Sequence, residues 1–297
     1  MLTVTEFSNF NLFVFMTFLV FDVGGTNMRM AYSVDGKKFE KQIKIKTPKT
    51  PKEGAKALKD FAEDLEVTRI AGGMRGVQME DKSGIEHDAT LEKWAGVSFA
   101  ALLFENFGED VLIRLENDTA LAGLGEAVLG AGAGCDLVVY HTVSTGVGGV
   151  KIESGQIDHA SVGFEPGHQI LDIDRTILGP DISPTLENLV SGTAVAQRMG
   201  VPPYEIPQDD VLWDELAGYL GQGLRNSVLY WSPEIIILGG SMITGDPKIP
   251  IDAIRKATVQ ILSNIVPCPF ITVATLGDDA VLYGALLLAQ QEFARNY

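Results

Sequence analysis

The sequence predicts an α/β protein built from two similar lobes that face each other across a cleft. Three observations support this fold class: strands alternate with helices, a pattern of strand, glycine turn and hairpin occurs twice, and the chain is long enough for two lobes. With 297 residues, of which 46% are hydrophobic, the chain can bury a sizeable core. This composition excludes intrinsic disorder as the main state of the protein.

Acidic side chains outnumber basic ones by 39 to 23, which gives a formal net charge of −16. A surface of this average charge repels nucleic acid backbones and anionic lipid, so binding to either would need a local basic patch. The densest basic run, Lys37 to Lys52, is spread over a predicted hairpin and loop and is typical of a solvated face or a protected edge strand. We therefore expect neither nucleic acid nor a membrane among the partners.

An apolar run from Phe10 to Phe21 opens the chain, and no Lys or Arg precedes it. This run is too short to span a bilayer, so we expect neither a signal peptide nor a membrane anchor. Met16 begins a self-contained strand, which favours Met16 as the natural start and residues 1–15 as an extension. Cys135 and Cys268 are too few for a disulfide framework, and this indicates a reducing compartment, the cytoplasm.

The first strand, Met16 to Phe21, ends in the turn Asp22-Val23-Gly24-Gly25-Thr26, and no helix pattern follows it. Instead, Asn27 to Val34 and Phe39 to Ile45 alternate as two strands around the turn signal Asp35-Gly36. In Rossmann and P-loop phosphate sites the glycine loop leads into a helix. The order in this chain therefore argues against both of those nucleotide-binding motifs.

The spacing of apolar residues next predicts a helix, a strand, a second helix and a second strand. These elements are expected over Ala55 to Leu65, Thr68 to Ala71, Phe99 to Phe107 and Val111 to Leu115. The last strand leads directly to Asn117 and Asp118, either of which can cap a helix that runs through Leu129. This alternation favours a largely parallel sheet that the opening hairpin extends.

A second copy of the opening pattern then appears. A strand over Leu137 to Thr142 leads into the turn Ser144-Thr145-Gly146-Val147-Gly148-Gly149, and another hairpin follows through Ile157. The rest of the chain continues to alternate. Its expected elements are a helix through Leu216 to Val228, a strand over Glu234 to Leu238 ended by Gly239-Gly240, a helix through Ile254 to Ile265, a strand over Phe270 to Ala274 and a helix over about Asp279 to Arg295.

This duplication predicts a smaller lobe, residues 16–116 with 284–297, and a larger lobe, residues 117–283. Each lobe would offer one glycine turn to a shared ligand. Glycine permits the close approach and positive dihedral angles that let backbone N–H groups converge on an anion. One such turn alone is more often just a tight hairpin turn. Their repetition after equivalent strands favours a pair of cradles for a polyphosphate.

Two carboxylates adjoin these elements. Asp22 stands at a strand end, where carboxylate oxygens suit Mg²⁺. Asp118 stands between a strand and a helix N-terminus, so we expect the helix dipole to hold it ionised and able to accept a hydroxyl proton. Taken alone, an aspartate in this position is more often only a helix cap. Glu126, farther along the same helix, could support such a site, but a surface carboxylate is the favoured interpretation, and His141 is expected to be structural.

Several motifs occur in an order that resembles one family. They are Asp22-Val23-Gly24-Gly25-Thr26, Glu116-Asn117-Asp118-Thr119-Ala120 with Glu126, Ser144-Thr145-Gly146-Val147-Gly148-Gly149, Glu165-Pro166-Gly167-His168, Leu186-Glu187-Asn188-Leu189-Val190-Ser191-Gly192 and Ile237-Leu238-Gly239-Gly240. From about Leu19 onward the chain resembles the repressor, open reading frame, kinase (ROK) family of sugar kinases. The resemblance implies an actin-like ATPase (ribonuclease H-like) fold, a homodimer, and ATP-dependent phosphorylation of a hexose or amino sugar, as in glucokinase.

The resemblance also implies a role for particular residues. Asp118 would be the catalytic base, and Asp22 would hold Mg²⁺. The expected sugar-binding residues are Gly76, Asn117, Glu165, His168 and Glu187. The expected ATP-binding residues are Asp22, Gly24, Gly25, Thr26, Asn27, Thr145, Gly146 and Gly148 at the phosphates and Gly239 and Gly240 at the adenosine.

The chain departs from the family pattern between Gln169 and Thr185, which lack the cysteines of the usual zinc motif. We therefore expect no structural zinc and a plain hydrogen-bonding role for His168. A zinc site made of His159, His168 and either Asp172 or Asp174 is a remote alternative.

Two further departures concern the substrate. Arg75 replaces the proline of the family's G-x-P-G motif, and its cation could clamp an anionic or phosphorylated group. The simpler interpretation is that Arg75 points to solvent. Thr90 occupies a position where the family commonly has Asn, which leaves the identity of the sugar open.

The alternative function is a non-catalytic sugar- or nucleotide-sensing protein of the same fold. The missing zinc segment favours this alternative, whereas the retained Asp118 argues against it. A DNA-binding repressor of the family would carry a helix-turn-helix domain, and we expect the segment before Asp22 to be too short for one.

Overall fold

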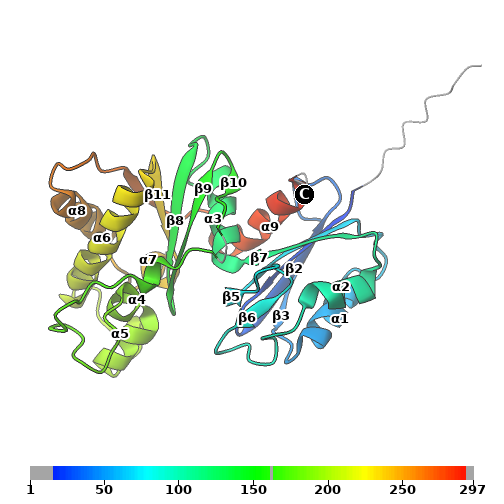
Figure 1. The fold of residues 1–297 in the computed structure, drawn as a ribbon, viewed down its shortest axis with the longest axis horizontal. Helices are drawn as coiled ribbons and strands as arrows, with labels where there is room; N and C mark the ends of the chain where they lie inside the picture. Colours follow the sequence, from blue (N-terminus) through cyan, green and yellow to red (C-terminus); the bar gives the residue numbers. More distant parts are fainter. Residues whose placement is uncertain (1–15, 161–162, 292–297) are drawn as a thin grey trace, which may run out of the picture.

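The computed structural model describes residues 16–160 and 163–291. The expectation that residues 1–15 form an extension lies outside this range, as do the end of the last predicted helix at Arg295 and the last residues of the predicted smaller lobe. Two five-stranded sheets, each covered by helices, lie side by side in Figure 1.

The first sheet has the order β3-β2-β1-β4-β7. Its strands are β1 (Phe18–Val23), β2 (Asn27–Ser33), β3 (Lys41–Lys46), β4 (Arg69–Met74) and β7 (Leu112–Asn117). The hairpin strands pair antiparallel, and β1, β4 and β7 pair parallel. Helices α1 (Pro51–Phe61) and α2 (Phe99–Phe107) pack together, and their core includes Leu58, Trp94 and Phe99.

The second sheet repeats this arrangement in the order β10-β9-β8-β11-β12. Its strands are β8 (Leu137–Val143), β9 (Val147–Glu153), β10 (Gln156–Ile157), β11 (Ile235–Gly239) and β12 (Phe270–Val273). An antiparallel hairpin again precedes the parallel strands. The predicted duplication of strand, glycine turn and hairpin is therefore confirmed.

Helices cover the second sheet according to the alternation of its side chains. Val139 and Ile236 pack in the cluster that includes α6 (Leu212–Trp231) and α8 (Ile251–Leu262). Val138 and Ile237 point to the opposite face, in the cluster with α3 (Asp118–Val128). The remaining short elements are β5 (Val77–Gln78), β6 (Ile85–His87), α4 (Leu186–Val190), α5 (Gly192–Met199), α7 (Ser241–Thr244) and the 3₁₀ turns η1 (Pro166–His168), η2 (Pro203–Glu205) and η3 (Gly277–Asp279).

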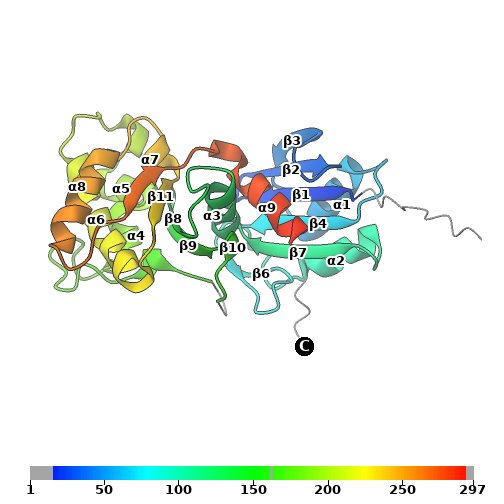
Figure 2. The ribbon, with the colours of Figure 1, turned by 90° about the horizontal axis from the view of Figure 1, so that it is seen from above.

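Helices α3 and α9 (Ala280–Gln290) lie against each other between the two sheets (Figure 2). Helix α9 packs on β1 and β4, whereas α3 packs on β8 and β9. The last carbonyls of α9 accept hydrogen bonds from first-sheet arginines, Ala289 from Arg69 at 2.7 Å and Leu288 from Arg114 at 3.1 Å. Cations at a helix C-terminus also favour the helix dipole, so α9 is anchored to the first sheet.

The predicted ends of some helices and strands agree with the structure, and others differ from it. Helix α2 has the predicted ends because Ser98 caps its first turn and Gly108, with φ of 95°, ends it. Strand β4 extends through Gly72 to Met74, beyond the predicted end at Ala71, because these residues stay paired with β1 on one side and β7 on the other. In the described ranges, no helix combines the length and apolar character that a membrane crossing requires.

The interpretation of Glu126 as a surface carboxylate is wrong. This side chain is fully buried on α3, and its oxygens accept backbone N–H groups of Thr275 at 2.7 Å, Leu276 at 2.6 Å and Ala131 at 3.0 Å. The carboxylate therefore ties α3 to the segment that leads into α9.

We predict that Glu126→Gln destabilises the protein by about 2–4 kcal/mol, because the amide NH₂ would face backbone donors that need an acceptor. Chemical or thermal unfolding of the purified variant measures the loss. The exposed Glu92, changed to Gln in the same way, is the control and should leave stability nearly unchanged. Equal stability of the Glu126 variant and the wild type would contradict the tying role.

Candidate active site

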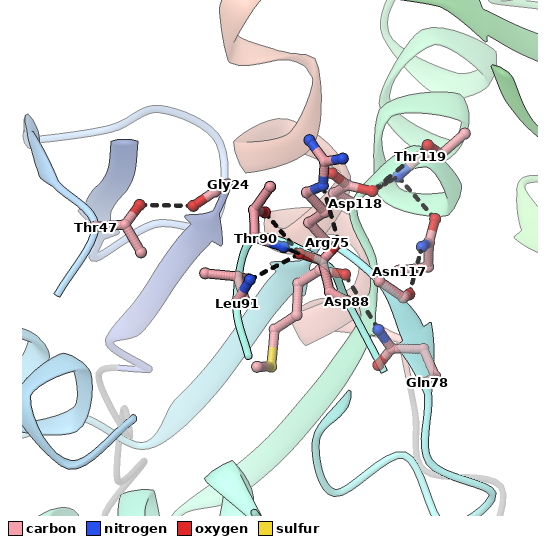
Figure 3. Close-up of polar contacts among 12 residues, drawn as sticks. Gly24, Thr47, Arg75, Gln78, Asp88, Thr90, Leu91, Asn117, Asp118 and Thr119 are labelled. Carbon is pink, nitrogen blue, oxygen red and sulfur yellow. Dashed lines mark hydrogen bonds and ion pairs between the residues drawn. The ribbon is translucent and has the colours of Figure 1, made fainter. Parts of the chain in front are cut away.

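The first glycine turn follows β1 and is held by its own backbone and by Thr47. The Gly24 N–H donates to the Asn27 carbonyl at 3.0 Å, and the Thr47 hydroxyl donates to the Gly24 carbonyl at 2.6 Å (Figure 3). Within the described part of the chain, the N–H groups of Gly25 and Thr26 have no acceptor. This turn thus presents two free donors, as an anion cradle requires.

The second glycine turn, Ser144 to Gly149, has a similar organisation. The Ser144 N–H donates to the Gly146 carbonyl at 2.8 Å, and the Val147 N–H donates to Glu187 at 2.8 Å. Among the residues that the structure describes, nothing accepts from the N–H groups of Thr145 and Gly146. Glu187, which we predicted as a sugar ligand, is therefore also a brace for the second turn.

The turn Gly239-Gly240 lies beside the second cradle, because the hydroxyl oxygens of Ser144 and Ser241 are 3.0 Å apart. Gly240 has φ of 87°, and a Cβ atom there would collide with the Val143 carbonyl, so this position requires glycine. The structure thus brings these two predicted ATP-binding segments together.

Helix α3 starts between the two sheets and carries Asp118. Of the two capping alternatives, Asn117 is the N-cap, and its side-chain oxygen accepts N–H groups of Thr119 and Ala120. A Cβ atom built on Gly148 of the second sheet would lie 2.9 Å from the Thr119 hydroxyl, and one built on Gly73 of the first sheet 3.2 Å from Asp118 Cα. Both sheets therefore approach the start of α3 closely.

Burial dominates the electrostatics of Asp118 and Asp22. Burial raises the pKa of Asp118, although a hydrogen bond from Thr119 and the charge of Arg75 oppose the shift. The helix N-terminus was expected to favour the ionised form of Asp118 and so to lower its pKa, but the pKa shifts in the opposite direction. Burial, followed by the charge of Asp118, raises the pKa of Asp22 to about 7, despite Arg29 at 3.6 Å.

Arg75 belongs to a network that sequence reasoning missed. Its Nε atom donates to Asp88 at 3.0 Å, and the other Asp88 oxygen accepts the Thr90 N–H at 2.7 Å, the Thr90 hydroxyl at 2.6 Å and the Leu91 N–H at 2.9 Å (Figure 3). Burial works against ionisation of Asp88, but these hydrogen bonds hold its pKa below the usual range. Arg75 is thus fixed beside Asp118, and the interpretation that it simply points to solvent is wrong.

A cavity that is partly open to solvent lies next to Asn117. Of the predicted sugar-binding residues, Gly76, Asn117 and Glu165 line it, whereas His168 and Glu187 do not. The predicted catalytic base, Asp118, is not among its lining residues either. Burial raises the pKa of Glu165, the charge of His168 lowers it, and the charges of Glu187 and Asp118 raise it. These groups are therefore close enough to influence one another.

Two further residues of this cavity, Gln78 and Lys82, escaped the sequence analysis. Lys82 pairs with Glu116, and Gln78 is buried in the lining of the same cavity. No local pattern marks the positions of Gln78 and Lys82. In contrast, Asp88 followed two residues later by Thr90 is a recognisable Asx-turn signal.

Among the described residues, the carboxylates of Asp22 and Asp118 suit a divalent cation. Burial raises the pKa of both, and Arg29 compensates only in part and leaves Asp22 with a pKa of about 7, so a cation would favour the ionised form. In residues 16–160 and 163–291, no three His, Cys, Asp or Glu side chains converge as a metal site. Asp172, from the alternative zinc set, instead accepts N–H groups of Ile177 and Leu178.

A family model described as "ROK family" matches residues 19–292. A fructokinase from Pediococcus pentosaceus is 28% identical over 284 residues, covering 91% of this chain and 96% of its own. The crystal structure of a ROK hexokinase from Thermus thermophilus has 27% identity and a TM-score of 0.79, covering 92% of this chain and 98% of its own. A ROK family glucokinase from Streptomyces griseus, in complex with glucose and AMPPNP, has 23% identity and a TM-score of 0.73, covering 93% and 100%. These likenesses confirm the predicted actin-like ATPase fold.

We predict that Asp22→Asn stabilises the protein at pH 8 and not near pH 4, in the absence of divalent cations. The folded state holds the Asp22 proton more tightly than the unfolded state does. The free energy of unfolding of the wild type therefore falls as the pH rises from about 4 to about 7. Asn does not titrate and escapes this loss, which amounts to at most roughly 4 kcal/mol.

Thermal unfolding between pH 4 and pH 8 measures this difference. The exposed Asp64, changed to Asn, is the control and should follow the wild type throughout. A constant gap between the Asp22 variant and the wild type at every pH would contradict the assignment.

Proposed function

The chain belongs to the ROK family, and we propose that it is an ATP-dependent kinase that phosphorylates a hydroxyl of a hexose or amino sugar. The observation that carries this proposal is the position of Asp118, half-buried at the start of α3, where both sheets approach it. Support also comes from the names of the relatives, a fructokinase and a ROK hexokinase, and from the glucose and AMPPNP bound to a glucokinase of the same fold.

In the proposed reaction, Asp118 accepts the proton of the sugar hydroxyl while that oxygen forms a bond to the γ-phosphorus of ATP. The bond from the γ-phosphorus to the bridging oxygen breaks, and ADP leaves. A pKa raised by burial makes Asp118 a better proton acceptor than an exposed aspartate. Little covalent help is needed, so positioning and charge neutralisation supply most of the catalysis.

The two cradles would bind the phosphates of ATP. The free N–H groups of Gly25 and Thr26 support this role in the first turn, and those of Thr145 and Gly146 support it in the second. The remaining proposed members of the ATP site are Gly24, Asn27, Gly148, Gly239 and Gly240. Mg²⁺ would neutralise phosphate charge when bound, and Asp22 is the residue that we propose to hold it.

The sugar would occupy the cavity lined by Asn117 and Glu165, and Asp118 directly follows Asn117 at the start of α3. Glu187 and His168 complete the proposed set, and Glu187 would join the sugar site to the second cradle through the Val147 N–H. Movement of the two lobes toward each other would exclude water, which otherwise competes with the sugar as phosphoryl acceptor.

We further propose the lobe boundaries 16–116 with 284–297 and 117–283, a homodimer, and a cytoplasmic location. The division is supported by the two sheets, which lie on either side of the α3–α9 contact. The dimer rests on the family resemblance alone. The location rests on the small number of cysteines, Cys135 and Cys268, which are both unpaired.

We predict that Asp118→Asn lowers kcat by about 10²- to 10⁴-fold, because the amide cannot accept the hydroxyl proton. Affinity for the sugar should change little, since Asn keeps the oxygen that accepts the Thr119 N–H. A coupled ADP-release assay over glucose, fructose, mannose and their amino derivatives measures kcat, and calorimetry measures binding.

If kcat of Asp118→Asn equals that of the wild type, Asp118 is not the catalytic base. Binding of sugar and ATP by the wild type without any turnover would favour the non-catalytic sensor instead.

We predict that Arg75→Gln shifts the acidic limb of the kcat/KM profile to higher pH. The positive charge of Arg75 lowers the pKa of Asp118, so its removal raises the pH at which the base becomes ionised. Rates between pH 5 and pH 9 measure the limb. Arg225→Gln, outside the site, is the control, and an unshifted limb in the Arg75 variant would show that Arg75 does not act on the base.

A further inference from the structure

Gln78 carries a buried oxygen that lacks a partner. The residue is 7% exposed, and Oε1 accepts no hydrogen bond from the residues that the structure describes. Gln78 lines the same cavity as Asn117 and Glu165. A buried acceptor without a donor is costly, so such a group in a ligand cavity calls for an explanation.

The orientation of the Gln78 amide is fixed by the backbone. Nε2 donates to the Met74 carbonyl at 3.1 Å (Figure 3), and a carbonyl can only accept, so the nitrogen must lie on that side. The oxygen is consequently the free end of the amide. The register of the β5–β6 pair is irregular between Val77 and Gln78.

The neighbouring side-chain donors that line the cavity bind other acceptors. The Lys82 ammonium is paired with Glu116, and the Asn117 amide nitrogen donates to the Gly76 carbonyl at 3.2 Å. Among the described residues, neither of these groups donates to the Gln78 oxygen, which is left for a donor from a ligand.

On the basis of the proposed function, we propose that Gln78 Oε1 accepts a hydrogen bond from a sugar hydroxyl other than the one that is phosphorylated. Gln78 is then a specificity-determining residue: it favours sugars that present a hydroxyl at this place and disfavours those that lack one. A site with a buried polar group rejects an analogue that cannot pair with it far more strongly than an apolar pocket rejects a small change in size.

The test compares the wild type with Gln78→Met, which keeps the length of the side chain and removes the acceptor. Calorimetry measures Kd for the best-bound sugar and for each of its monodeoxy analogues, and the ADP-release assay is run in parallel. We expect Gln78→Met to weaken binding of the parent sugar about tenfold or more, the factor that corresponds to one lost hydrogen bond, with the KM for ATP unchanged.

The deoxy series identifies the hydroxyl. One deoxy analogue should bind the wild type about tenfold or more weakly than the parent sugar does. The same analogue and the parent sugar should bind Gln78→Met with nearly equal affinity, because the variant has already lost that contact. Gln260→Met, at an exposed glutamine outside the cavity, is the matched control and should behave as the wild type. Near-ultraviolet circular dichroism confirms that each variant is folded.

The outcomes separate this inference from the proposed function. Sugar binding that depends on Gln78 without turnover would overturn the kinase and support the role of Gln78. Turnover with an unchanged Kd in Gln78→Met, or equal losses for every deoxy analogue in both proteins, would overturn the role of Gln78 and leave the kinase standing. Absence of binding for every sugar tested would overturn both.

Discussion

The close crossing of α3 and α9 is the constraint on which the rest of the structure depends. A side chain at Gly284 would collide with the Leu121 carbonyl, and a side chain at Gly125 would meet the backbone of Ala280. Both helices therefore need glycine where they touch. Because α9 packs on the first sheet and α3 on the second, this contact joins the two sheets and sets where Asp118, the first residue of α3, can lie.

The site divides its charges between backbone and side chains. Free amide donors in the two turns suit phosphate oxygens, whereas the acids Asp22 and Asp118 suit a cation and a proton. Burial of these acids lowers the stability of the free protein, since their ionised forms lose hydration without full compensation. Such local departures from the most stable arrangement are typical of functional sites.

Sequence patterns predicted the repeated topology, the ends of α2 and the elements that carry Asp22 and Asp118, because those signals are local. The partners of Glu126 could not be predicted, since Thr275 and Leu276 are distant in sequence and meet it only after α3 and α9 have packed. Arg75 was misjudged for a similar reason, because the β5–β6 hairpin separates it in sequence from its partner Asp88. The pKa of Asp118 could not be predicted either, because it depends mainly on burial, and burial results from the packing of the whole fold.

The return of α9 to the first sheet has a consequence for biosynthesis. Phe18, Val20 and Ala71 form one apolar cluster with Leu282 and Leu286 of α9. The ribosome delivers the first sheet well before this helix, with the complete second sheet emerging in between. One apolar face of the nascent first sheet thus stays exposed until α9 has been synthesised. During this period the exposed apolar strands are prone to aggregation and can be bound by chaperones.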